Sequence, residues 1–170
     1  MSLTSSDYAL LKSSLQQFVA QHLPLGRAMG IDVHHYDASS LALAAPLALN
    51  DNDKDTAFGG SLYCVAVMSC WSSVYLRCLE QQLIDPTLPR GTPNIVVSKA
   101  AIEYLAPVRS EQIVAHCSSP AAESWDGFFA RYASHGSAKI SLASTVNTDI
   151  NGMGKTAVDF SGAYSLIGFY

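Results

Sequence analysis

A 21-residue stretch without a charged side chain, from Thr56 to Leu76, dominates the sequence. It lies between Asp55 and Arg77, and about 20 apolar residues are enough for a helix to cross a bilayer. Seven of its residues are Thr, Gly or Ser, however, and the regions on both sides alternate like strands of a soluble sheet. We therefore predict a helix from about Gly60 to Leu83 that is buried on all sides in a soluble protein, and no membrane span.

The composition supports one core and an oligomer. Of the 170 residues, 49% are hydrophobic and only 14% are charged, against a usual charged share of about 25%. We expect a single domain over residues 1–170, with too few charged side chains to cover the surface of a monomer. The net charge of −4 argues against nucleic acid as a partner, because a phosphate backbone requires a basic surface.

The cysteines and the first residues indicate a cytoplasmic protein. The four cysteines, Cys64, Cys70, Cys78 and Cys117, form no C-x-x-C pair, which is typical of reduced thiols. Three of them lie in the apolar helix, where burial makes a thiol inert, so a cysteine nucleophile is not expected. The N-terminal residues lack a basic segment followed by an apolar block, and we expect no secretion signal.

Two kinds of element precede the apolar helix. Apolar spacing predicts a one-sided helix from Thr4 to Leu23, with a capping box of Thr4 and Asp7, ended by Pro24. Residues 29–50 alternate with a period of two and predict two strands joined near residues 37–40. His34 and His35 then point to opposite faces, one exposed and one packed.

The chain after the helix is predicted to be sheet. Residues 84–93 form a connection, and strands are expected at 94–108, 111–119, 127–136 and 137–149, with a hairpin turn at His135 and Gly136. We interpret Asn151 to Gly154 as a turn. Strands segregated from one central helix predict an α+β fold, with an antiparallel sheet curved around that helix.

Several motifs that would require a cofactor or a metal are incomplete. DNDKDT lacks the glycine and the closing glutamate of a calcium loop, and Asp149 replaces the first glycine of a phosphate loop before NGMGKT. There is no G-x-S-x-G elbow, and the histidines show no zinc spacing with the cysteines. We expect no metal and no cofactor.

The segment from Asn52 to Ser61 is the part of the sequence most suited to chemistry. A polar loop with Asn52 and Asp55 leads through a glycine pair, Gly59 and Gly60, into the N-terminus of the buried helix. Free N–H groups and the positive end of the helix attract developing negative charge, and glycine permits close approach. An oxyanion site for a carbonyl fits this pattern, although a glycine pair also allows tight packing of a helix on a sheet.

The chain resembles the putative thioesterase family typified by the C-terminal domain of YiiD, a branch of the hotdog-fold superfamily. The resemblance covers roughly Leu23 to Asp149, and the ordered combination of PLGRAMGI, TAFGGSLY with Trp71, and IEYLAPV carries it. It implies a hotdog fold, a homodimer or a dimer of dimers with sites at the subunit interface, and acyl groups carried on coenzyme A or acyl carrier protein, as in fatty acid metabolism. Thioester hydrolysis is the activity that it implies most directly.

Asn52, Gly59 and Gly60 match the residues that thioesterase relatives carry at these positions. Two positions depart from the wider superfamily: Phe58 stands where many relatives have a histidine, although TAFGGS is typical of the YiiD-like branch, and Val67 stands where some have a catalytic carboxylate. The resemblance therefore leaves the general base unassigned.

Our hypothesis for the chemistry is hydrolysis of an acyl thioester. The N–H groups of Gly59 and Gly60 polarise the carbonyl, Asn52 positions water or the acyl carbonyl, and Phe58 and Ser61 contact the substrate. Asp55 is the candidate base, or else a solvated or helix-capping carboxylate. Two alternatives stay open: decarboxylation of a malonyl-type thioester, and a non-catalytic module that binds acylated coenzyme A or carrier protein.

Overall fold

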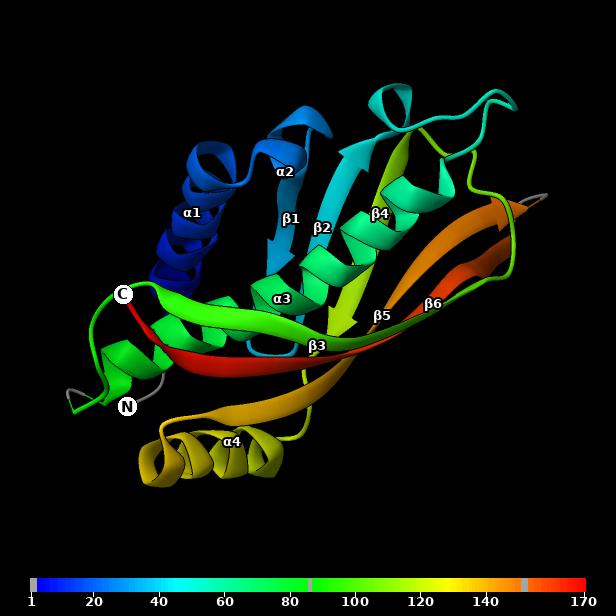
Figure 1. Ribbon diagram of the computed structural model, residues 1–170. Helices are drawn as coiled ribbons and strands as arrows, with labels where there is room; N and C mark the ends of the chain where they lie inside the picture. The colour runs from blue at the N-terminus through cyan, green and yellow to red at the C-terminus, as the bar shows by residue number, and fades with distance from the viewer. Residues whose placement is uncertain (1–2, 86, 151–152) are drawn as a thin grey trace.

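A six-stranded antiparallel sheet curves around one long helix in the computed structural model of the chain, which describes residues 3–85, 87–150 and 153–170 (Figure 1). The strand order is β1-β2-β4-β5-β6-β3, and every neighbouring pair is antiparallel. The predicted α+β class is confirmed. The strands are β1 (Asp32–Tyr36), β2 (Ser40–Pro46), β3 (Pro93–Tyr104), β4 (Gln112–Ser118), β5 (Ala138–Ile150) and β6 (Met153–Phe169).

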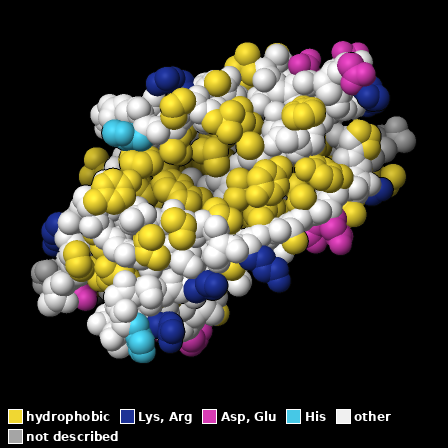
Figure 2. Space-filling view, in the orientation of Figure 1, with side chains coloured by type: hydrophobic (Ala, Val, Ile, Leu, Met, Phe, Trp, Pro, Cys, Tyr) yellow, Lys and Arg dark blue, Asp and Glu magenta, His cyan; other side chains and the backbone are white. Residues whose placement is uncertain are grey.

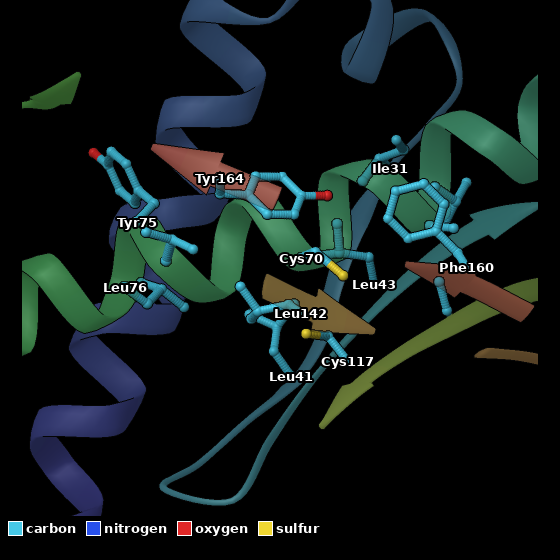
Figure 3. Packing of buried hydrophobic residues seen from close by; sticks show 14 of the residues in the cluster. Ile31, Leu41, Leu43, Cys70, Tyr75, Leu76, Cys117, Leu142, Phe160 and Tyr164 are labelled. Atoms are coloured by element: carbon cyan, nitrogen blue, oxygen red, sulfur yellow. The ribbon is translucent and has the colours of Figure 1, made fainter. Parts of the chain in front are cut away.

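The central helix is α3 (Gly59–Ile84), close to the predicted bounds. Small side chains let it approach the sheet, because Ala66 and Ser69 are fully buried and the Ser69 hydroxyl donates a 2.8 Å hydrogen bond to the Ser144 hydroxyl on β5. Figure 3 shows Cys70 of α3 and Tyr164 of β6 in this core, and the Tyr164 hydroxyl donates to the carbonyl of Val67 at 2.9 Å. α3 is long and apolar enough to cross a membrane, but here it packs in the core, and 61% of its most apolar 18-residue stretch is buried.

One face of α3 is not covered, which corrects the expectation of a helix buried on all sides. Its side chains are only half-buried, whereas the opposite face packs on the sheet. We call this face the open stripe of α3. It consists of Gly60, Tyr63, Cys64, Val67, Met68 and Trp71. These positions follow the i, i+3, i+4, i+7 spacing of a single helical face.

The N-terminal region largely follows the prediction. α1 (Ser5–His22) begins at the expected capping box, in which Thr4 and Asp7 bond each other reciprocally. Pro24 does not only end this helix, because it is the first residue of the short α2 (Pro24–Ala28), where its fixed φ is suitable. The expectation of one packed histidine is wrong: an irregularity in β1 at His34 leaves both His34 and His35 exposed.

The C-terminal half holds two further corrections. The segment predicted as a strand at 127–136 belongs to α4 (Ala122–His135), and Gly136 is the left-handed cap of that helix at φ 70°, not a hairpin residue. The turn predicted at Asn151 to Gly154 lies partly outside the described residues, and its last two residues begin β6, a strand that the sequence analysis missed.

The outer strand β3 exposes several large apolar side chains. β3 is an edge strand that, within the described parts of the chain, pairs with β6 alone, and most of its residues are exposed. Three large side chains on it, Val96, Val97 and Tyr104, are 42%, 42% and 53% exposed. A long apolar edge of this kind is a surface on which another strand can pair.

Candidate active site at the N-terminus of α3

Backbone hydrogen bonds fix the start of α3. Phe58 is the N-cap in an extended conformation (φ −64°, ψ 135°), and its N–H donates to the carbonyl of Asn50 at 2.8 Å. The preceding residue, Ala57, donates to the carbonyl of Val108 at 2.9 Å. These two bonds hold the residues before the helix against Asn50 and Val108. The helix begins at Gly59, one residue before the predicted start at about Gly60.

The first amides of α3 have no acceptor among the residues that the structure describes. Gly59, Gly60 and Ser61 occupy the first turn, where N–H groups lack intrahelical partners. No side chain among the described residues caps this end of the helix, so Asp55 is not a helix cap. The helix thus presents unsatisfied donors and the positive end of its dipole at one point.

An aromatic ring lies beside each of the two glycines. The Tyr104 hydroxyl on β3 donates to the carbonyl of Gly59 at 2.9 Å, and its ring lies 3.6 Å from the position that a Cβ on Gly59 would take. A Cβ on Gly60 would lie only 2.5 Å from Cε1 of Phe58. Phe58 is 56% exposed and so remains available for contact with a ligand. Tyr104 is a residue of the site that the sequence analysis did not assign.

Asn52 is half-buried and organises its own loop. Its Oδ1 accepts from the backbone N–H of Lys54 at 2.9 Å, and its Nδ2 donates to the hydroxyl of Thr56 at 3.0 Å. Its backbone N–H donates to the carbonyl of Thr56 at 2.9 Å. A side-chain amide has two N–H donors, and this arrangement uses one of them within the described residues. The second N–H has no hydrogen-bond partner among the described residues.

Asp55 occupies a strained and exposed turn next to Asn52. Its φ of 53° lies in the left-handed region, and its carboxylate forms no hydrogen bond or ion pair with the part of the chain that the structure describes. Its backbone carbonyl accepts from Arg109 at 3.4 Å, and that of Lys54 does so at 3.2 Å. Arg109 therefore clamps the backbone of this turn and leaves the carboxylate in solvent.

An apolar groove of about 310 Å³ opens along the middle of α3. We call it the α3 groove. It lies between the chain around α2 on one side and β3 on the other, and the last three residues of the open stripe, Val67, Met68 and Trp71, form its floor. It is lined by Leu23, Pro24, Leu25, Gly26, Val67, Met68, Trp71 and Val97. Figure 2 shows hydrophobic side chains gathered in a band across this face, with a hollow within it.

The glycine pair and the groove share one face of the helix. Gly60 is the first residue of the open stripe, and Val67 and Met68, two turns later, line the groove. Between them lies Cys64, and burial raises the pKa of its thiol, which keeps it protonated. The described residues contain no group of three His, Cys, Asp or Glu side chains placed to hold a metal ion.

A sheet curved around a long helix, with free amides at the helix tip and an apolar groove further along the same helix, is the arrangement of a hotdog-fold thioesterase. The sequence matches the putative thioesterase family YiiD_C (yiiD_Cterm) over residues 12–167. The chain belongs to this family, whose class of activity is thioester hydrolysis.

Solved structures agree with this assignment. A protein of unknown function from Chlorobaculum tepidum TLS is 38% identical, with a TM-score of 0.84 over 94% of this chain and 96% of that one. A putative thioesterase from Shewanella oneidensis is 28% identical, with a TM-score of 0.75 over 94% and 99% of the two chains. A thioesterase from Haemophilus influenzae, 15% identical with a TM-score of 0.58 over 99% and 93%, shares the fold.

Proposed function

We propose that this protein hydrolyses acyl thioesters of coenzyme A or acyl carrier protein at the N-terminus of α3. One observation carries the proposal: the amides of Gly59 and Gly60, which have no acceptor among the described residues, lie at the start of α3, and Val67, Met68 and Trp71 on the same face as Gly60 line the α3 groove from two turns later. A thioester carbonyl at these amides would have its alkyl chain directed along an apolar surface. Polar recognition at one end and apolar burial at the other is what an acyl thioester requires.

In this proposal the helix tip stabilises the charge that develops on the carbonyl oxygen. Water attacks the carbonyl carbon, the oxygen becomes negative, and the amides of Gly59 and Gly60 donate to it. The C–S bond then breaks, giving a carboxylic acid and a thiol. Asp55 accepts a proton from the water and returns it to the thiolate, while the second N–H of Asn52 orients the water. Phe58 and Ser61 contact the substrate near the carbonyl.

We also propose that two copies of the chain join through β3, as a homodimer or a dimer of dimers in the cytoplasm. The edge of β3 is unpaired within the described chain and carries exposed Val96, Val97 and Tyr104. Tyr104 and Val97 belong to the site and to the groove, respectively. A partner at this edge would therefore border both the site and the groove. The reduced, unpaired cysteines support a cytoplasmic location.

The test replaces the amide of Gly59 without removing the helix. Gly59 is the first helical residue and Phe58 before it is extended, so proline fits this position and deletes the N–H. Gly59→Pro is expected to lower kcat on the best acyl-CoA about 100-fold, the usual effect of losing an oxyanion donor. Gly59→Ala keeps the N–H and its Cβ meets Tyr104 at an ordinary 3.6 Å, so it is the matched control with near-normal kcat. Equal activity in both variants would refute the proposal.

Decarboxylation of a malonyl-type thioester is the second candidate, because Asp55, the candidate base, is exposed and its carboxylate forms no hydrogen bond or ion pair with the described residues. Such a reaction needs an oxyanion site but no base, since the substrate supplies the leaving carboxylate as carbon dioxide. Analysis of the products separates the two reactions. Hydrolysis releases free thiol, whereas decarboxylation leaves a shortened, intact thioester. Binding without either product, seen as a thermal shift with acyl-CoA, would indicate a non-catalytic module.

A further inference from the structure

Trp71 is the last residue of α3 that lines the α3 groove, and it is held from several sides. Its indole N–H donates to the carbonyl of Ile95 on β3 at 3.1 Å, which bridges the helix and the strand. Its ring stacks on Tyr75, with centroids 5.2 Å apart and planes 22° apart, and on Phe18 of α1 at 5.9 Å and 23°. An aromatic ring with a hydrogen bond and two stacked neighbours is a fixed wall and not a flexible gate.

One wall of the groove packs closely on its floor. A Cβ added to Gly26 would lie 3.0 Å from Cγ1 of Val19 and 3.1 Å from Cε of Met68. The chain around α2 therefore lies about as close to Met68 as a glycine allows. A ligand does not enter between these elements, and it lies along α3 between the chain around α2 and Val97 of β3.

The length follows from helix geometry. From Gly60 to Trp71 is eleven residues, or about 16 Å at 1.5 Å per residue, and the Trp71 side chain leans back toward the N-terminus by about one residue. An extended chain advances about 1.2 Å per bond, by the spacing of fully extended backbone. About ten to twelve carbons therefore fill the distance between a carbonyl at Gly60 and the Trp71 ring. Shorter chains leave apolar wall unfilled, and longer ones meet the indole.

We infer that Trp71 sets the length of the acyl chain, and that the substrates are medium-chain acyl thioesters. The inference rests on the proposed function, because the carbonyl position at Gly59 and Gly60 defines the start of the measured distance. Each buried CH₂ changes affinity by about fourfold. The preference is therefore steep up to the chain that reaches Trp71, and it reverses beyond that chain.

The experiment measures binding and turnover separately. Straight-chain fatty acids from hexanoate to palmitate, kept below their micelle concentrations, are titrated into the full chain by calorimetry, and the matching acyl-CoA esters are assayed for kcat/KM. The variants are Trp71→Ala, which opens the end wall, Trp71→Phe, which keeps an aromatic wall, and Val97→Phe, which fills the groove from the exposed edge of β3. Circular dichroism checks that each variant is folded.

We expect the wild type and Trp71→Phe to prefer decanoate or dodecanoate over palmitate by about tenfold or more. Trp71→Ala should improve palmitate relative to decanoate about tenfold, and Val97→Phe should move the optimum to shorter chains. The inference is overturned if no fatty acid binds, or if the chain preference is the same in wild type, Trp71→Ala and Val97→Phe. Should Trp71→Ala not fold, Val97→Phe alone decides.

The two proposals fail in different ways. A chain preference in binding that shifts with Trp71, but without hydrolysis of any acyl-CoA, supports the role of Trp71 and refutes the proposed hydrolysis. Hydrolysis of short and long acyl-CoA esters at similar kcat/KM supports hydrolysis and overturns the role of Trp71.

Discussion

The Tyr104 hydroxyl donates a 2.9 Å hydrogen bond to the carbonyl oxygen of Gly59, so the edge strand β3 holds the first residue of the central helix. This bond fixes the first peptide units of α3, whose amides we assign to the thioester carbonyl. Tyr104 is thus a positioning residue that acts through Gly59. Because Tyr104 lies on the exposed edge of β3, the binding of another chain at that edge would act directly on the first residue of α3.

Tyr104→Phe is expected to lower kcat about 2- to 10-fold, the range for loss of one hydrogen bond of about 0.5–1.5 kcal/mol. KM and the melting temperature should change little, because the ring is kept and the side chain is 53% exposed. Steady-state kinetics and thermal unfolding measure both. Tyr132→Phe on α4, which also loses only a hydroxyl, is the control. An unaltered kcat in Tyr104→Phe would show that the bond does not position the amides.

The elements predicted correctly from sequence are those with a local signal. The capping box of Thr4 and Asp7, the period of two around residues 32–46 and the uncharged run of α3 each determine their own structure. α4 was misread because Gly136 serves equally as a hairpin residue and as a helix cap. The buried or half-buried aromatics Trp125, Phe128, Phe129 and Tyr132 carry the i, i+3, i+4, i+7 signal that would have identified it.

The missed strand β6 also had a readable pattern. Phe160, Tyr164 and Leu166 lie two or four residues apart and are all fully buried, as alternation on one face requires. For the candidate site, sequence identified the glycine pair but not Tyr104 or the chain around α2. These residues reach the site only through the tertiary fold, because β3 and α2 meet α3 from distant parts of the chain.

A buried ion pair near the other end of α3 should contribute strongly to stability. Arg77 and Glu80 lie 2.6 Å apart with side chains 17% and 6% exposed, and the Tyr36 hydroxyl donates to the second oxygen of Glu80 at 2.6 Å. Arg77→Ala leaves the Glu80 carboxylate buried without its cation. We expect a loss of about 3–5 kcal/mol in the free energy of unfolding, measured in urea.

Lys54→Ala is the matched control, because the Lys54 and Asp53 side chains pair at 2.9 Å but are 72% and 80% exposed. Its effect on unfolding should be within about 0.5 kcal/mol. Below their unfolding temperatures, both variants should keep the kcat of the wild type. Similar losses of stability in the two variants would show that burial does not govern the contribution of the Arg77 pair.

His116 should make stability depend on pH. Partial desolvation of a side chain that stays largely exposed, together with the nearby His34 and His35, holds the pKa of His116 below the value of 6.5 expected when unfolded. The register places His35 and His116 on either side of Ala42, on one face of the sheet. The unfolded chain takes up the proton more readily than the folded one. The contribution of neutral His116 to the free energy of unfolding is therefore fully present above pH 6.5, and it is lost as the pH falls through 6.5 toward the lower folded pKa.

His116→Gln removes this titration and should flatten the decline of the melting temperature between neutral pH and about pH 5. Since the ring is exposed and screened, the difference between the two curves should be about 1 °C. Differential scanning calorimetry at a series of pH values measures it. A steeper decline in the variant would mean that the sign of the pKa shift is wrong.

Gly60→Ala tests whether the ring of Phe58 belongs to the substrate site. The added Cβ would lie 2.5 Å from Cε1 of Phe58, and because the ring is 56% exposed it can rotate into solvent at little cost to stability. The N–H of residue 60 is retained, so kcat should change little, whereas KM should rise several-fold as the ring leaves the acyl group. Phe58→Ala should raise KM by a similar factor. The double variant should be no worse than Phe58→Ala alone, since both substitutions remove the same contact. Steady-state kinetics on the wild type, the two single variants and the double variant measure the coupling. If the two effects on KM multiply in the double variant, Gly60→Ala does not act through the ring of Phe58, and the ring is not part of the substrate site.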